Sequence, residues 1–117
     1  MSDTITIYHN PRCSKSRATL ALLEENDAQA DVVEYLNTPP NAGQLNDILN
    51  MLDLEPRELM RTHEAEYKAA GLDDSSLTRA QLIEAMVKHP KLIERPIVVK
   101  NGKAVIGRPP ERVLDIL

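Results

Sequence analysis

One cysteine, Cys13, lies in a polar and cationic stretch of the chain, and it is the residue best suited to chemistry. His9 precedes it by four residues, and Arg12, Lys15 and Arg17 are its close neighbours in sequence. The thiolate is the nucleophilic form of cysteine, and nearby cations lower the pKa of a thiol. The stretch therefore predicts a reactive thiolate rather than the small buried side chain that a lone cysteine usually provides.

Cys13 also stands at an expected junction between a strand and a helix. In residues 4–8, Ile5 and Ile7 alternate with Thr4 and Thr6 as in a strand, and residues 14–25 are rich in helix formers. The backbone N–H groups at a helix N-terminus lower the pKa of a cysteine and bind anions. A single loop is thus expected to combine a nucleophile, its activation and an anion site.

Two familiar thiol motifs and a zinc site are excluded by the spacing. Ser16 stands where a C-x-x-C motif needs its second cysteine, and Thr19 stands where C-x5-R needs its arginine. One cysteine and three dispersed histidines do not predict a metal site. Any oxidised Cys13 must therefore be reduced by a thiol from another molecule through a mixed disulfide.

The segments around this junction predict an α/β fold. A second strand over residues 31–36 completes a β-α-β unit with a right-handed crossover. A helical block follows, in which Asn41 caps one helix, residues 54–71 are helical up to a stop at Gly71, and Thr78 opens another helix with a capping box.

The last third of the chain predicts a hairpin and a closing helix. Residues 97–99 and 104–106 flank Asn101-Gly102, the strongest short hairpin signal. Residues 111–117 follow as a helix with Val113, Leu114 and Ile116 facing inward. The order is β-α-β, a helical insertion, then β-β-α, which is that of a thioredoxin-like fold with a mixed four-stranded sheet, in one domain over residues 1–117.

Composition restricts the partners and the location. The net charge of −4, the absence of Trp and Phe and the presence of only three Tyr argue against nucleic-acid binding. The sequence contains no run of about 18 apolar residues, so it predicts no membrane span. The N-terminus has no basic region followed by an apolar stretch, and a lone cysteine suits a reducing compartment, so we expect a cytoplasmic monomer.

Residues 9–17 resemble the His-x3-Cys-x3-Arg motif of the glutaredoxin-dependent arsenate reductases. The resemblance extends in order along nearly the whole chain, through residues 37–40, 59–61, 94–99 and 107–109. It implies a thioredoxin-like fold and the reduction of arsenate to arsenite with glutathione as co-substrate and glutaredoxin as partner, with no bound cofactor.

The resemblance also assigns roles to residues. It implies that Cys13 is the nucleophile, that His9 and Arg17 help to activate it, and that Arg61, Arg95 and Arg108 bind the oxyanion. Arginine suits this task because its planar fork can bind two oxygens of a tetrahedral anion. Further residues are expected to shape the site: Asn10, Pro11, Ser16 and Pro96, the last as the cis-proline that faces the cysteine in thioredoxin-like folds.

Two other functions stay open at this point. A glutathione-dependent thiol-disulfide reductase needs Cys13 but not three arginines. An Spx-like module that binds RNA polymerase has the same fold, but many such regulators carry C-x-x-C where this chain has Cys13 and Ser16.

Overall fold

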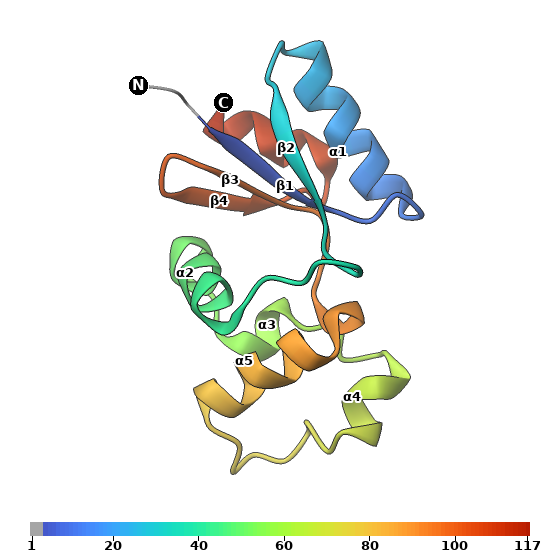
Figure 1. Ribbon diagram of the computed structural model, residues 1–117, viewed down its shortest axis with the longest axis vertical. Helices are drawn as coiled ribbons and strands as arrows, with labels where there is room; N and C mark the ends of the chain where they lie inside the picture. The colour runs from blue at the N-terminus through green and yellow to red at the C-terminus, as the bar shows by residue number, and fades with distance from the viewer. Residues whose placement is uncertain (1–3) are drawn as a thin grey trace. The chain divides into compact units, whose positions relative to one another are not determined.

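The computed structural model describes residues 4–117, which group into two compact units (Figure 1). The first unit comprises residues 4–38 and Arg95–Leu117, and the second comprises Pro39–Glu94. Within the described range, no helix is both long and apolar enough to cross a membrane. The single domain expected from the sequence stays a prediction.

A four-stranded sheet forms the centre of the first unit, in the order β2-β1-β3-β4. Its strands β1 and β2 are parallel, and the pairs β1–β3 and β3–β4 are antiparallel, so the predicted mixed thioredoxin-like sheet is confirmed. The elements of this unit are β1 (Ile5–His9), α1 (Ser14–Glu25), β2 (Ala30–Glu34), β3 (Ile97–Lys100), β4 (Lys103–Ile106) and the 3₁₀ helix η2 (Pro110–Ile116).

The core of the first unit lies on one face of this sheet. Ile5 and Ile7 are two residues apart on β1 and therefore point to the same face, where Ile7 is paired with Val98 of β3. Leu23 of α1 and Val113 of η2 pack onto this face, and all five side chains are buried. This packing holds α1 and η2 against the sheet.

The predicted hairpin is present between β3 and β4. Asn101 has φ 51° and Gly102 has φ 74°, the two positive φ values that a tight turn of this kind requires. The register pairs Ile97 with Ile106, and the N–H of Gly107 donates to the carbonyl oxygen of Pro96 at 2.9 Å. The hairpin thereby brings Arg108 next to Arg95, although 13 positions separate them in sequence.

The second unit is helical, and in Figure 1 its helices α2, α3 and α5 lie together. Asn41 and Thr78 cap α2 and α5, and Thr78 forms a capping box with Gln81, as the sequence predicted; Asn41 forms a capping box with Gln44 as well. The elements are α2 (Ala42–Leu52), α3 (Pro56–Leu59), α4 (Ala65–Ala69), α5 (Arg79–Lys88) and the 3₁₀ helix η1 (Pro90–Leu92).

The continuous helical stretch predicted over residues 54–71 is wrong. Two short helices, α3 and α4, stand there instead. Met60 between them is extended and forms an isolated antiparallel bridge with Ile93. The N–H of Arg61 donates to the carbonyl oxygen of Leu92 at 2.7 Å, so pairing with a distant segment overrides the local helix preference.

The closing segment also differs from the prediction, because η2 is a 3₁₀ helix. Its three residues per turn place Pro110, Val113 and Ile116 on one side. Leu114, predicted to face inward, falls on another side and is 44% exposed. The second strand is shifted as well, since β2 ends at Glu34 rather than at residue 36.

Replacement of the buried Ile7 should destabilise the protein far more than a similar change on an exposed strand position. We expect Ile7→Ala to lower the free energy of unfolding by about 2–5 kcal/mol, because it leaves a cavity in the core. Val32→Ala on β2, whose side chain is 46% exposed, should cost less than about 1 kcal/mol. Urea unfolding of both variants measures the difference, and equal losses would contradict this position of the core.

Candidate active site

Cys13 occupies the N-cap position of α1, directly after a turn that leaves β1. Its backbone is extended, with φ −95° and ψ 123°. The N–H of Cys13 donates to the carbonyl oxygen of Asn10, and the N–H of Arg17 donates to the carbonyl oxygen of Cys13, each at 3.0 Å. The first bond closes the turn and the second begins the helix, so the cysteine is held at the junction that the sequence predicted.

The environment of the sulfur favours the thiolate. Burial raises the pKa of Cys13, but the backbone N–H groups of Ser16 and Lys15 and the guanidinium of Arg95 outweigh it and hold that pKa below its ordinary value. N–H groups and a cation stabilise the charged form of a thiol, which is the nucleophile. The side chain of Cys13 is only partly buried, so a small molecule can reach it.

A buried hydroxyl beneath the loop connects His9 to the turn. The Oγ of Ser16 accepts a hydrogen bond from the N–H of Asn10 at 3.0 Å and lies 2.6 Å from Nδ1 of His9. Since that oxygen already accepts from Asn10, its own proton can be donated to Nδ1 of a neutral His9. Burial lowers the pKa of His9 foremost; Glu34 opposes this shift and Arg17 adds to it. His9 therefore supports the loop through Ser16.

Two further contacts fix the turn from its solvent side. Nη1 of Arg17 donates to the carbonyl oxygen of Pro11 at 2.9 Å. The N–H of Arg12 donates to Oδ1 of Asn10 at 3.0 Å. Arg17 thus acts on the backbone of the loop, one turn of helix beyond Cys13.

Arg108 is the side chain that the hairpin brings to the sulfur. Its Nη2 lies 3.6 Å from Sγ of Cys13, and its Nε donates to the carbonyl oxygen of Arg95 at 2.8 Å. The side chain of Arg108 is therefore hydrogen-bonded to the backbone of Arg95. Together the two arginines place positive charge beside the thiolate.

The loop that carries Arg108 packs closely against Pro96 and α1. The Arg95–Pro96 peptide is cis, as the resemblance implied, and the Arg108–Pro109 peptide is cis as well. A Cβ on Gly107 would overlap Oγ1 of Thr19 and would lie 2.9 Å from Cγ of Pro96. Glycine is required at this position because the backbone approaches both neighbours.

Arg61, the third predicted oxyanion ligand, belongs to the second unit, directly after Met60. Nη1 of Arg61 is 3.4 Å from Oε1 of Glu64, and its Nε is 3.9 Å from Oε1 of Glu94. Its Nη2 lies 3.2 Å from Nε2 of His63. The guanidinium therefore faces side chains of its own unit through all three nitrogens.

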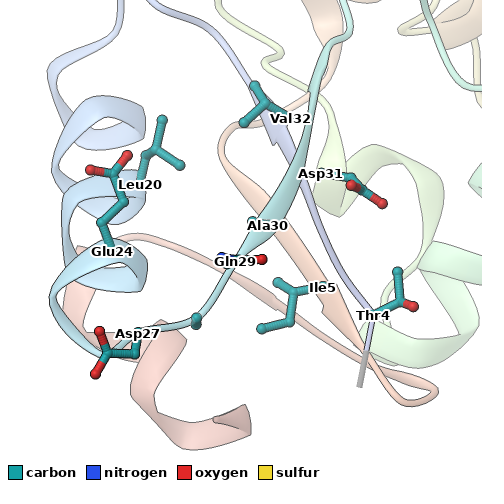
Figure 2. A pocket seen from close by; sticks show the side chains of 10 residues that line it. Thr4, Ile5, Leu20, Glu24, Asp27, Gln29, Ala30, Asp31 and Val32 are labelled. Atoms are coloured by element: carbon teal, nitrogen blue, oxygen red, sulfur yellow. The ribbon is translucent and has the colours of Figure 1, made fainter. Parts of the chain in front are cut away.

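A hollow of the first unit lies away from Cys13, at the other end of α1 (Figure 2). Its volume is about 750 Å³, and it lies between α1 and the start of strands β1 and β2. Glu24, Asp27 and Asp31 line it, together with apolar and neutral polar side chains, and none of the described residues that line it is an arginine or a lysine. Carboxylates repel an oxyanion, so this hollow is a poor site for one.

The structure brings most of the predicted site residues of the first unit together around Cys13. Sequence reasoning missed Gly107 and Thr19, which control how closely the hairpin approaches α1. Gly107 could have been predicted from its place in the sequence, because it lies between an apolar strand and an Arg-Pro pair. Sequence reasoning also missed Glu64 and Glu94, which ordinary charge patterning does not relate to a distant arginine.

Comparison with known proteins gives consistent results. The model of the ArsC family matches residues 8–116. The Escherichia coli K12 protein YfgD, described as uncharacterized, is 58% identical over 118 residues, which is 100% of this chain and 99% of YfgD. An arsenate reductase of Neisseria meningitidis serogroup A is 52% identical over 97% of each chain. The structure of an arsenate reductase from Vibrio cholerae covers both chains fully at 52% identity, with a TM-score of 0.95.

Removal of the charge of Arg95 should shift the reactivity of Cys13 toward higher pH. We expect Arg95→Gln to raise the pKa of the thiol, since the guanidinium of Arg95 stabilises the thiolate. The rate of alkylation by iodoacetamide as a function of pH measures this pKa. Arg12→Gln is the matched control, because Arg12 is an exposed arginine of the same loop and is not among the influences on the thiol. Identical profiles for Arg95→Gln and the wild type would contradict the assignment.

A methyl group at Gly107 should disturb both stability and thiol reactivity. We expect Gly107→Ala to lower the free energy of unfolding by about 1–3 kcal/mol through overpacking against Thr19 and Pro96, and to slow alkylation of Cys13 as Arg108 moves away. In Gly43→Ala, the new Cβ would be 3.4 Å from Oδ1 of Asn41, so a change of less than about 1 kcal/mol is expected. An unchanged stability and alkylation rate in Gly107→Ala would be inconsistent with this packing.

Proposed function

Because the chain belongs to the ArsC family, we propose that it is an arsenate reductase in which the thiolate of Cys13 attacks arsenate. The observation that carries the proposal is the position of Nη2 of Arg108, 3.6 Å from Sγ of Cys13, in a loop where N–H groups and Arg95 lower the thiol pKa. Relatives named arsenate reductase support the choice of arsenate among oxyanions.

Arginine side chains bind the substrate in this proposal. Arsenate is tetrahedral and carries two or so negative charges near neutral pH, as phosphate does. Arg95 and Arg108 beside Cys13 offer planar N–H donors to its oxygens, and Arg61 is the third ligand that the resemblance implies. Cations that are already in place also stabilise the charge that develops as an oxygen leaves arsenic.

The first chemical step forms a bond between sulfur and arsenic. The thiolate of Cys13 attacks arsenic, and one arsenate oxygen leaves as water after taking up two protons. Arsenic stays in its pentavalent state in this adduct. The N–H groups of Ser16 and Lys15 hold the sulfur at the helix N-terminus during the attack.

The second step reduces arsenic at the expense of two thiols. The thiolate of glutathione attacks the sulfur of Cys13, and the sulfur–arsenic bond breaks with its electron pair going to arsenic. Trivalent arsenite is released, and a mixed disulfide joins Cys13 to glutathione. A glutaredoxin thiolate then attacks the glutathione sulfur and restores Cys13, because this chain has no second cysteine. The glutathione pool of the cytoplasm suits this cycle.

His9, Ser16, Asn10 and Arg17 act as positioning residues in this scheme. Ser16 connects His9 to the backbone of Asn10, and Arg17 holds the carbonyl oxygen of Pro11. These contacts keep the loop in a shape in which the N–H groups at the start of α1 converge on the sulfur. A preformed loop avoids reorganisation in the transition state.

Oxidation of NADPH, coupled through glutathione reductase to glutathione and glutaredoxin, tests the proposal. We expect wild-type oxidation to depend on arsenate and Cys13→Ser to lose about a thousandfold or more in turnover, as removal of a nucleophile does. Arg95→Ala should lose about a hundredfold, as removal of one charge-stabilising donor does. Arg12→Ala, an exposed arginine of the same loop, should keep wild-type activity.

Other outcomes would move the assignment. Turnover of a glutathione mixed disulfide without any response to arsenate would favour a thiol-disulfide reductase that uses the same cysteine. No turnover of either substrate, together with capture of RNA polymerase, would favour the binding module. Normal activity of Cys13→Ser would refute the nucleophile.

A further inference from the structure

We infer that Glu64 and Glu94 compete with the incoming oxyanion for Arg61 and thereby set the affinity of the proposed site. This inference rests on the proposed function only in treating Arg61 as an oxyanion ligand. It concerns the second unit alone, where all the contacts that carry it lie. Glu64 precedes α4, and Glu94 follows the bridge residue Ile93.

Each of the three guanidinium nitrogens of Arg61 faces a side chain of the second unit. Oε1 of Glu64 lies 3.4 Å from Nη1, and Oε1 of Glu94 lies 3.9 Å from Nε. Nη2 lies 3.2 Å from Nε2 of His63. An oxyanion that binds Arg61 therefore shares the guanidinium with two carboxylates, whose negative charge opposes its approach.

The burial of these groups makes the competition effective. The side chains of Arg61 and Glu64 are 15% and 16% exposed, and that of Glu94 is 27% exposed. Solvent therefore screens their attraction less than it screens an exposed pair. The Nε of Arg61 is buried and has no hydrogen-bond partner among the described residues, since 3.9 Å is too long for one. An oxyanion can satisfy this donor where Glu94 does not.

Besides Arg61, Glu64 faces His63, whose Nε2 is 3.7 Å from Oε1, and Lys91. Nζ of Lys91 lies 3.5 Å from Oε2 of Glu64 and 3.6 Å from Oε2 of Glu66, while Oε1 of Glu64 faces Arg61. Glu64 can therefore keep an ion pair with Lys91 when an oxyanion takes its place on Arg61. Glu66 belongs to the same cluster and forms an ion pair with Lys91 rather than with Arg61, which makes it a matched control.

Isothermal titration of the full chain with arsenate, and separately with inorganic phosphate, tests the inference. We expect Glu64→Gln and Glu94→Gln each to tighten anion binding about fivefold, which at 1.4 kcal/mol per factor of ten is about 1 kcal/mol, the upper end for an exposed ion pair. Glutamine keeps the size and an acceptor oxygen but removes the charge. Glu66→Gln should tighten binding by less than about twofold, because its charge is farther from Arg61.

A double variant shows whether the gain passes through Arg61. In an Arg61→Gln background, Glu64→Gln should bring no gain in affinity. Unchanged or weaker binding in both Glu64→Gln and Glu94→Gln would overturn the inference, and so would a gain that persists without Arg61. Equal gains from Glu66→Gln and Glu64→Gln would also overturn it, since the effect would then come from net charge alone.

The same titrations separate this inference from the proposed function. Tighter anion binding through Arg61 in a protein that does not reduce arsenate would sink the proposed function and leave the competition intact. Arsenate reduction by the wild type with affinities that do not respond to Glu64 or Glu94 would sink the competition alone. No anion binding by the wild type or any variant would overturn both.

Discussion

Stabilisation of the thiolate form of a cysteine at a helix N-terminus is the constraint on which the rest of the first unit depends. Partial burial disfavours the thiolate of Cys13, whereas N–H groups of α1 and the guanidinium of Arg95 favour it and lower the pKa of the thiol. Those N–H groups point at the sulfur only if the turn after β1 keeps its shape. The buried Ser16 hydroxyl, between His9 and the backbone of Asn10, provides this rigidity.

The β3–β4 hairpin meets the same requirement from the other side. A cation must reach the sulfur from a segment far away in sequence, and the tight turn at Asn101-Gly102 returns the chain so that Arg108 ends beside Arg95. Gly107 permits this approach because it has no Cβ to meet Thr19 and Pro96. The position of the positive charge therefore depends on three features together. These are the register of the hairpin, the absence of a side chain at Gly107 and the contact between Arg108 and Arg95.

The sequence allowed a good prediction of the fold wherever local signals determine structure. The helix cap at Asn41, the capping box at Thr78 and the Asn-Gly turn are short-range patterns, and all three are present. The continuous helix over residues 54–71 failed because Met60 pairs with Ile93, a contact with no local signature. The prediction for the closing segment was wrong for a related reason. The packing of Val113 at 3₁₀ spacing determines which side chains of this segment point inward.

For the site, spacing in the sequence predicted which residues near Cys13 take part, but it did not predict the partners of each arginine. These partners distinguish the arginines chemically. Nε of Arg108 is oriented by the carbonyl oxygen of Arg95, a contact that adds no formal negative charge beside the thiolate. Arg61 is instead held by carboxylates, whose charge offsets its own. A carbonyl anchor orients a cation without adding negative charge beside it, whereas a carboxylate anchor competes with an incoming anion. Two arginines with the same predicted task can thus contribute to it in opposite ways, one by attraction alone and the other by exchange.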